Sequence, residues 1–277
     1  MTHGDEPAGL AAVEYVIEHI LPNKRLLRGS IFLVLNNARA AERYFGAESE
    51  EEARQTRFVN TNMNRLARAA LEEASSVTYE VVRVKELEDI YEQFDVGIDI
   101  HSTAQESEPM IIVLGTEFPS AIVNGIPIQN VITNIDRVQI GKPVSHLYGR
   151  RKNDAIRVGI EAGSHENPET FRTAVATVKA VLGNLGMFAV DPDLDSQVYE
   201  EYEVFDSVRF PDESYSLTRL FEDHEFIVKG TVIAQGNGPD IAVSEDCCAL
   251  FASRMKPLFL NEEVMFLTRP AVRRDPE

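Results

Sequence analysis

A regular alternation of short apolar β-forming runs and longer helical segments over residues 1–190 constrains the fold of this chain most strongly. The predicted strands are Ser30–Leu35, Val96–Ile100, Met110–Leu114 and Val158–Ala162, of which the first reads as buried. Helical spacing follows Pro7 and returns over Lys85–Phe94 and Thr170–Leu185. This alternation predicts an α/β layered fold with a largely parallel sheet, in which ligands gather at the carboxyl ends of strands.

The pattern changes after Ala189. Asp191-Pro192-Asp193 interrupts the helical periodicity, and short strands follow between turn residues, at Glu201–Phe205, Phe226–Ala234, Cys248–Phe251 and Glu263–Leu267. A chain of 277 residues is long enough for one large domain and a smaller one. We therefore expect an α/β domain at 1–190 and a small all-β domain at 191–277.

The composition excludes several kinds of partner. A formal net charge of −18 argues against nucleic acid and anionic membrane surfaces, and it allows an anionic small substrate only where cations gather locally. The sequence contains neither a long apolar run that could span a membrane nor a signal peptide. Cys247 and Cys248 are adjacent and poorly placed to bridge each other. We therefore expect a cytoplasmic protein, which could form a homo-oligomer.

Two segments carry residues that can bind a metal. His3-Gly4-Asp5-Glu6 comes just before the first predicted helix, and Asp99-Ile100-His101 ends a predicted strand. A His and a Glu three residues apart, completed by a distant His, can hold zinc and leave a fourth position open for water, as in catalytic zinc sites. The tetrapeptide alone is a weak signal, because short motifs arise by chance and a carboxylate at a helix start needs no metal.

Two further segments carry groups suited to amide chemistry. Arg57 precedes Asn64-Arg65 by seven residues, which provides two guanidinium groups and an amide that can bind carboxylates or stabilise an oxyanion. Glu161 lies in a strand of apolar and small residues, where burial beside a metal would make it a natural general base. Taken singly, the arginines could be surface residues of an acidic protein, and Glu161 could face solvent.

Taken in order along the chain, these motifs resemble the succinylglutamate desuccinylase/aspartoacylase family, whose members are relatives of the zinc carboxypeptidases. The resemblance rests on His3-x-x-Glu6, Arg57, Asn64-Arg65, Asp99-x-His101 and Glu161-x-Gly163. It covers most of residues 1–190, with a matching β-rich tail. It implies a zinc-carboxypeptidase-like layered domain with a mostly parallel mixed sheet, and five elements in order are far more specific than any one of them.

The resemblance also implies catalytic roles. His3, Glu6 and His101 would hold one zinc ion (Zn2+) per chain. Glu161 would take the proton of the attacking water and return it to the leaving amine. Arg57 would stabilise the tetrahedral oxyanion.

Substrate-binding roles follow from the same resemblance. Asn64 and Arg65 would bind a substrate carboxylate, and Arg151, with Tyr148 nearby, occupies the position of another substrate-binding arginine of aspartoacylases. The basic cluster around Arg151 could instead be a solvated loop. Asp99 is either a carboxylate that orients His101 or an ordinary residue at a strand end.

Three features depart from the family pattern. Asn62 stands two residues before Asn64, where the family usually has an acidic residue. No Tyr follows Tyr215, although the C-terminal domain of aspartoacylases supplies a substrate-binding Tyr. Only Met1 and Thr2 precede His3, where the family has its first strand. We therefore expect either a truncated reading frame or a site that lacks this strand.

These observations together predict a zinc-dependent amidohydrolase that deacylates a small anionic N-acyl amino acid or a similar acylated amine. One alternative is a zinc carboxypeptidase that acts on peptide C-termini with the same metal site. Another is a catalytically inactive relative that only binds a ligand. The intact His3, Glu6, His101 and Glu161 argue against the inactive relative, whereas the missing first strand argues for it.

Overall fold

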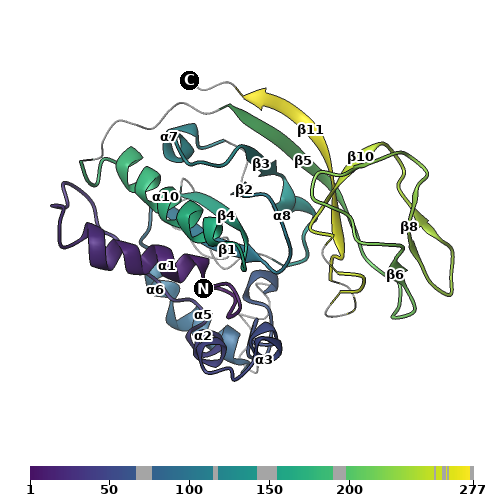
Figure 1. Ribbon diagram of the computed structural model, residues 1–277, viewed down its shortest axis with the longest axis horizontal. Helices are drawn as coiled ribbons and strands as arrows, with labels where there is room; N and C mark the ends of the chain where they lie inside the picture. Colours follow the sequence, from purple (N-terminus) through teal and green to yellow (C-terminus); the bar gives the residue numbers. More distant parts are fainter. Residues whose placement is uncertain are drawn as a thin grey trace.

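A computed structural model describes residues 1–66, 77–114, 118–141, 155–189, 198–252, 254–257, 260 and 262–274. They form an eight-stranded mixed sheet, a separate three-stranded sheet, and helices that cover the larger sheet (Figure 1). The expected α/β fold with a large mixed sheet and a small additional C-terminal sheet is therefore confirmed. No helix in these ranges is long and apolar enough to cross a membrane.

The large sheet contains strands from both parts of the chain. In spatial order they are β1 (Val96–Thr103), β4 (Ile156–Ser164), β2 (Met110–Leu114), β3 (Asn130–Thr133), β5 (Tyr199–Val208), β11 (Met265–Arg274), β10 (Cys247–Leu250) and β7 (Phe226–Ile227). The pairs β1–β4, β2–β3 and β3–β5 are parallel, whereas β2–β4 and the pairs beyond β5 are antiparallel. C-terminal strands therefore continue the sheet that begins in the N-terminal part.

The small sheet consists of β6 (Ser216–Leu217), β8 (Val232–Gln235) and β9 (Ile241–Ala242). The predicted strand Phe226–Ala234 is divided between β7 and β8, because a turn with Gly230 at φ +85° interrupts it. The predicted domain boundary after residue 190 falls outside the described residues, so the two-domain division stays a prediction.

The three predicted helical segments are helical in the structure, with shifts at their ends, and several further short helices were not predicted. The helices are α1 (Ala8–Tyr15) with a π-helical turn η1 (Val16–Ile20), α2 (Ala38–Phe45), α3 (Glu50–Arg54), the 3₁₀ helix η2 (Met63–Arg65), α5 (Tyr79–Glu86), α6 (Glu88–Tyr91), α7 (Ser120–Val123), α8 (Ile135–Val138) and α10 (Pro168–Asn184). The helix predicted over Lys85–Phe94 is two helices joined at Leu87. Asn167 caps α10, and Pro168 starts it, as the sequence favours.

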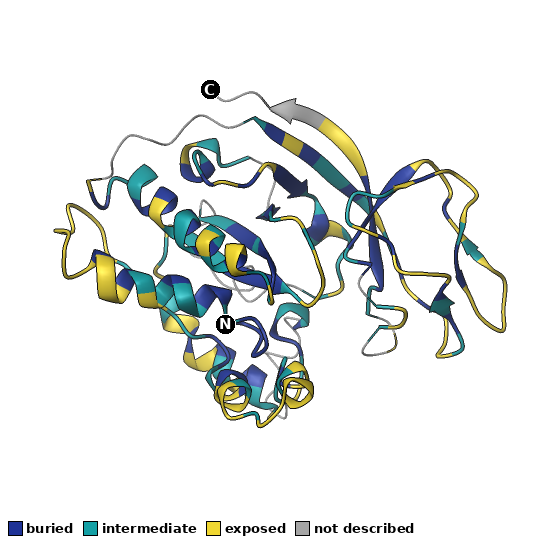
Figure 2. Cartoon of the chain, viewed as in Figure 1, coloured by how far each residue is buried: buried dark blue, intermediate teal, exposed yellow. Residues whose placement is uncertain are grey.

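The main core lies between the sheet and the helices α1 and α10, which pack side by side against β1 and β4 (Figure 1). Small residues such as Ala8, Ala12 and Ala174 let these helices approach Ile100 and Ile160 of the strands. Figure 2 shows the buried strands beneath them, while the outer surfaces of α2 and α3 are exposed. This packing fixes the end of β1 beside the beginning of α1.

The prediction of a buried strand over Ser30–Leu35 is wrong. This segment forms no strand, and Phe32 and Leu33 are 45% and 37% exposed. A run of β-forming residues becomes a strand only when another backbone edge pairs with it. Here the carbonyl groups of Leu35 and Asn36 accept hydrogen bonds from the Arg83 side chain instead.

A cavity of about 760 Å³ separates this apolar segment from the outer edge of β1. Among the described strands, β1 pairs only with β4, so its other edge carries no partner. Met1 lines the same cavity, and its carbonyl accepts a hydrogen bond of 3.0 Å from the Asn37 amide. The cavity is lined mostly by apolar side chains and lies apart from the histidines described next.

Candidate active site

The N-terminal segment lies at the carboxyl end of β1 and contacts it through Thr2. Thr2 is buried, and its hydroxyl donates to Asp99 Oδ1 at 2.9 Å. The Gly4 amide donates to the Arg57 carbonyl at 2.9 Å. A Cβ atom on Gly4 would lie 2.2 Å from the Thr56 carbonyl oxygen, so only glycine fits between His3 and Glu6.

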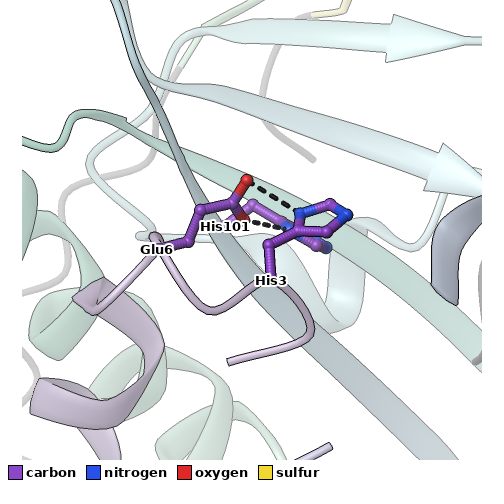
Figure 3. A group of neighbouring side chains, drawn as sticks. All are labelled: His3, Glu6 and His101. Atoms are coloured by element: carbon purple, nitrogen blue, oxygen red, sulfur yellow. Dashed lines mark hydrogen bonds and ion pairs between the residues drawn. The ribbon is translucent and has the colours of Figure 1, made fainter. Parts of the chain in front are cut away.

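His3, Glu6 and His101 converge in one buried group (Figure 3). His3 Nδ1 lies 2.8 Å from Glu6 Oε1, and His101 Nδ1 lies 2.6 Å from Glu6 Oε2. One ligand atom from each residue falls within 4.8 Å of the other two. Two imidazole nitrogens and one carboxylate oxygen at such spacing match the ligand set of a catalytic zinc site.

The outer nitrogen of each imidazole also has a partner. His3 Nε2 lies 2.9 Å from Asn62 Oδ1, and His101 Nε2 lies 3.2 Å from Asp99 Oδ2. Hydrogen bonds of this kind fix the ring orientation and the tautomer of metal-binding histidines. Asn62 therefore orients His3 at the position where the family usually has an acidic residue. Asp99 contacts His101, as expected if Asp99 is a carboxylate that orients this histidine.

The charges in this group stabilise one another. Burial alone would raise the pKa of Glu6, but His3, Arg57 and His101 hold it well below its ordinary value. Burial would lower the pKa of His101, yet Asp99 and Glu6 raise it well above the usual range. The carboxylate of Glu6 is thus ionised and ready to bind a cation.

Glu161 lies beside this group because of strand register. The parallel pairing of β1 with β4 sets His101 directly opposite Glu161, and partners in register project to the same face of a sheet. Burial raises the pKa of Glu161 to about 8, and Oε2 of its carboxyl group is buried without a hydrogen-bond partner among the described residues. A buried acid with an unsatisfied oxygen beside a cation site is suited to proton transfer.

A cavity of about 220 Å³ joins these side chains to residues from the C-terminal part of the chain. Arg57 lines it, and its Nη1 donates to Glu6 Oε1 at 2.6 Å and to Asp5 Oδ1 at 3.4 Å. Asn64 lines it too, with Nδ2 located 3.2 Å from His101 Nε2 and Oδ1 buried without a partner among the described residues. The structure therefore gathers Arg57, Asn64 and Glu161 around the three side chains that could hold a metal.

Arg65 lines the same cavity but already has an acidic partner. Its Nε donates to Glu263 Oε2 at 3.2 Å, and the Glu263 side chain is fully buried. Glu263 also forms an ion pair of 3.3 Å with Arg209. Arg151 and Tyr148, the other predicted substrate-binding residues, lie outside the described residues.

Sequence reasoning missed two cavity residues, Glu263 and Arg254. Both follow the main motifs by roughly a hundred residues or more, and neither has a spacing that points to the site. The only available signal is that each is a charged residue close to a predicted C-terminal strand.

Comparisons with known proteins agree with this geometry. The succinylglutamate desuccinylase/aspartoacylase catalytic domain matches residues 1–182. The fold resembles that of a succinylglutamate desuccinylase from Vibrio parahaemolyticus, with a TM-score of 0.74 and 16% identity over 99% of this chain and 80% of the other. It also resembles murine aminoacylase 3, with a TM-score of 0.64 and 18% identity over 99% and 96% of the two chains.

A third similar structure is a succinylglutamate desuccinylase from Chromobacterium violaceum, with a TM-score of 0.66 and 20% identity over 98% of this chain and 82% of the other. At these identities, the structural matches show a shared fold. No curated protein matches the chain. The match over residues 1–182 covers well over half of the sequence and agrees with the motif order, so the chain belongs to the succinylglutamate desuccinylase/aspartoacylase family.

Proposed function

We propose that this protein is a zinc-dependent amidohydrolase that removes the acyl group from a small anionic N-acyl amino acid. One observation carries the proposal: the buried group of His3, Glu6 and His101 shares a cavity with Glu161, whose Oε2 has no partner among the described residues. Amide hydrolysis needs an electrophilic metal and a proton acceptor next to each other. The similar structures named desuccinylase and aminoacylase support the same reaction class.

The residues present fit a zinc ion. One imidazole nitrogen from each histidine and one Glu6 carboxylate oxygen lie within 4.8 Å of one another, and the donor set of two nitrogens and one oxygen suits this metal. A bound zinc ion would polarise the amide carbonyl group and make the attacking water more acidic. Asn62 and Asp99 would hold the two imidazole rings in position for it.

The side chains of the chain itself have separate roles in the proposed reaction. Glu161 accepts the proton of the attacking water and passes it to the nitrogen of the leaving amine. Arg57, with Nη1 beside Glu6, stabilises the negative charge that develops on the carbonyl oxygen. Asn64 orients the substrate, because its side-chain oxygen is buried in the cavity without a partner among the described residues.

Arg65 contributes positive charge to the substrate-binding site. Its ion pair with Glu263 holds the guanidinium group in place, which favours an indirect contribution over the direct carboxylate contact that the sequence suggested. A cavity of about 220 Å³ favours a small substrate over a peptide chain, and this supports deacylation over the carboxypeptidase alternative. Arg151 and Tyr148 as substrate-binding residues, the cytoplasmic location and a homo-oligomeric state stay predictions.

An activity screen of the zinc-loaded protein tests the proposal. We expect hydrolysis of N-acetyl or N-succinyl amino acids, loss of activity on chelation, and recovery when zinc is restored. The control substrates are dipeptides with a free C-terminus. Faster cleavage of these dipeptides than of any N-acyl amino acid would favour the carboxypeptidase, and full zinc occupancy without any turnover would favour an inactive relative.

A further inference from the structure

The cavity at the metal-binding group contains three arginine side chains among the described residues: Arg57, Arg65 and Arg254. Arg57 forms ion pairs with Glu6 and Asp5, and Arg65 forms one with Glu263. Arg254 forms no ion pair and no hydrogen bond with any described residue. Among the described residues it is therefore the cavity arginine whose charge can pair with a ligand.

The surroundings of Arg254 make an unpaired charge costly. The residue is half-buried, and burial lowers the pKa of its guanidinium group, which the positive charge of Arg57 lowers further. Asp5 and Glu262 oppose this shift, but neither forms an ion pair with it in the part of the chain that the structure describes. A partly desolvated cation of this kind is stabilised when a carboxylate binds to it.

The position of Arg254 in the fold also separates it from the catalytic residues. It follows β10 in the C-terminal part of the chain, whereas His101 and Glu161 lie on β1 and β4. All three line the same cavity. A small substrate held at its amide by the metal-binding group can therefore present a second group to Arg254.

We propose that Arg254 is a carboxylate receptor of the active site and that it selects substrates with a carboxylate at a distance from the amide that is cleaved. The inference rests on the proposed function, because it assigns a partner to that same site. A guanidinium group binds a carboxylate through two parallel hydrogen bonds, and this gives it both strength and orientation. Local positive charge also explains how a chain with a net charge of −18 accepts an anion.

A binding measurement on the zinc-loaded protein tests the proposal without requiring turnover. The probes are succinate and succinamate, which differ only in that succinamate carries an amide in place of one carboxylate. We expect wild-type protein to bind succinate at least about tenfold more tightly than succinamate, as measured by isothermal titration calorimetry. In Arg254→Gln this preference should shrink to within about twofold, and Arg254→Lys should lie between, because lysine keeps the charge without the planar fork.

Lys256→Gln is the matched control. Lys256 lies two residues further along, is exposed, does not line the cavity, and donates to the Glu213 carbonyl. This variant removes the same charge and should keep the wild-type preference. A wild-type protein without a preference for succinate would overturn the proposal, and so would an Arg254→Gln variant that retains it. Equal weakening of both probes would show a structural role only and would overturn it as well.

Kinetics then separate this inference from the proposed function. For N-succinyl amino acids we expect Arg254→Gln to raise KM about tenfold or more. KM for the corresponding N-acetyl amino acids, which lack the carboxylate distant from the cleaved amide, should change less than about twofold. Absence of all turnover by the wild type would contradict the proposed function, and the binding comparison would still decide the role of Arg254. Turnover with KM values that Arg254→Gln leaves unchanged would contradict only the role of Arg254.

Discussion

The two histidines of the site use their nitrogens in the same way. Each Nδ1 faces the Glu6 carboxylate, and each Nε2 faces a different oxygen, that of Asn62 or Asp99. The inner contacts can be exchanged for a metal ion, while the outer contacts can remain. His3, Glu6 and His101 are all buried, so water does not solvate the Glu6 charge, and a bound cation would compensate it.

The first prediction concerns these ligands. We expect about one zinc ion per wild-type chain by elemental analysis, and far less in His101→Ala, because one of three protein ligands is lost. His19→Ala is the control, since His19 is exposed on η1. Stoichiometric zinc in His101→Ala would show that the metal assignment is wrong.

The second prediction concerns Glu161. Glu161→Gln should retain zinc and lose turnover by roughly 10²–10⁴-fold, the usual contribution of a general base, because an amide cannot accept the proton of the water. Zinc content and kcat are measured on the same preparation. Loss of metal in parallel with activity would instead identify Glu161 as a ligand.

The third prediction follows from the raised pKa of Glu161. In the metal-free protein burial raises this pKa to about 8, above the value in an unfolded chain, so the folded state favours the neutral acid. Its stability should therefore fall as the pH rises from about 4.5 to about 8, by up to ~1.4 kcal/mol per pH unit. Glu161→Gln lacks this effect. The melting temperature of the variant minus that of the wild type should therefore increase from pH 6 to pH 9. A constant difference in metal-free melts would contradict the assignment.

Among the elements, the cavity of about 760 Å³ lies between the segment Ser30–Leu35 and the strand β1, both of which are rich in β-forming residues. Met1 lines this cavity, and its carbonyl already accepts a hydrogen bond from Asn37. An extended segment placed there could form backbone hydrogen bonds with the free edge of β1 and cover the exposed side chains of Phe32 and Leu33.

The fourth prediction tests this geometry. Adding five or six β-forming residues before Met1 should tighten zinc binding and raise the melting temperature, because His3 would then follow an anchored strand. The measurements are a zinc titration against a competing chelator and thermal melts. An added Gly/Ser segment of equal length is the control. Equal affinity and stability in all versions would show that the contacts of Thr2 and Gly4 already fix His3.

For the whole molecule, Glu263 connects parts that are distant in the sequence. Its buried carboxylate accepts hydrogen bonds from Arg65 near the catalytic motifs, from the Ile140 amide and from Arg209 after β5. The eight-stranded sheet makes the same connection through β3 and β5. The cavity therefore depends on the C-terminal part of the chain as well as on residues 1–182.

The fifth prediction concerns this connection. Glu263→Gln should lower the free energy of unfolding by about 2–3 kcal/mol. This is less than the loss of one partner of a fully buried ion pair would cost, because Arg65 and Arg209 are partly exposed. Urea denaturation measures the change. Glu225→Gln, which breaks the more exposed pair with Arg219, is the control and should cost less than about 1 kcal/mol. Similar effects for both variants would contradict the role of Glu263.

Periodicity and motif order along the chain were enough to assign the α/β class and the family, because both can be read without knowing any long-range contact. The convergence of His3, Glu6 and His101 was expected only through the family resemblance. The sequence also located Glu161 in a strand. That Ser30–Leu35 forms no strand could be seen only in the folded chain, because a strand depends on a partner edge that periodicity does not reveal. Likewise, only folding brought Glu263 to Arg65 and left Arg254 without an acidic partner among the described residues, because such pairings join residues almost two hundred positions apart in the sequence.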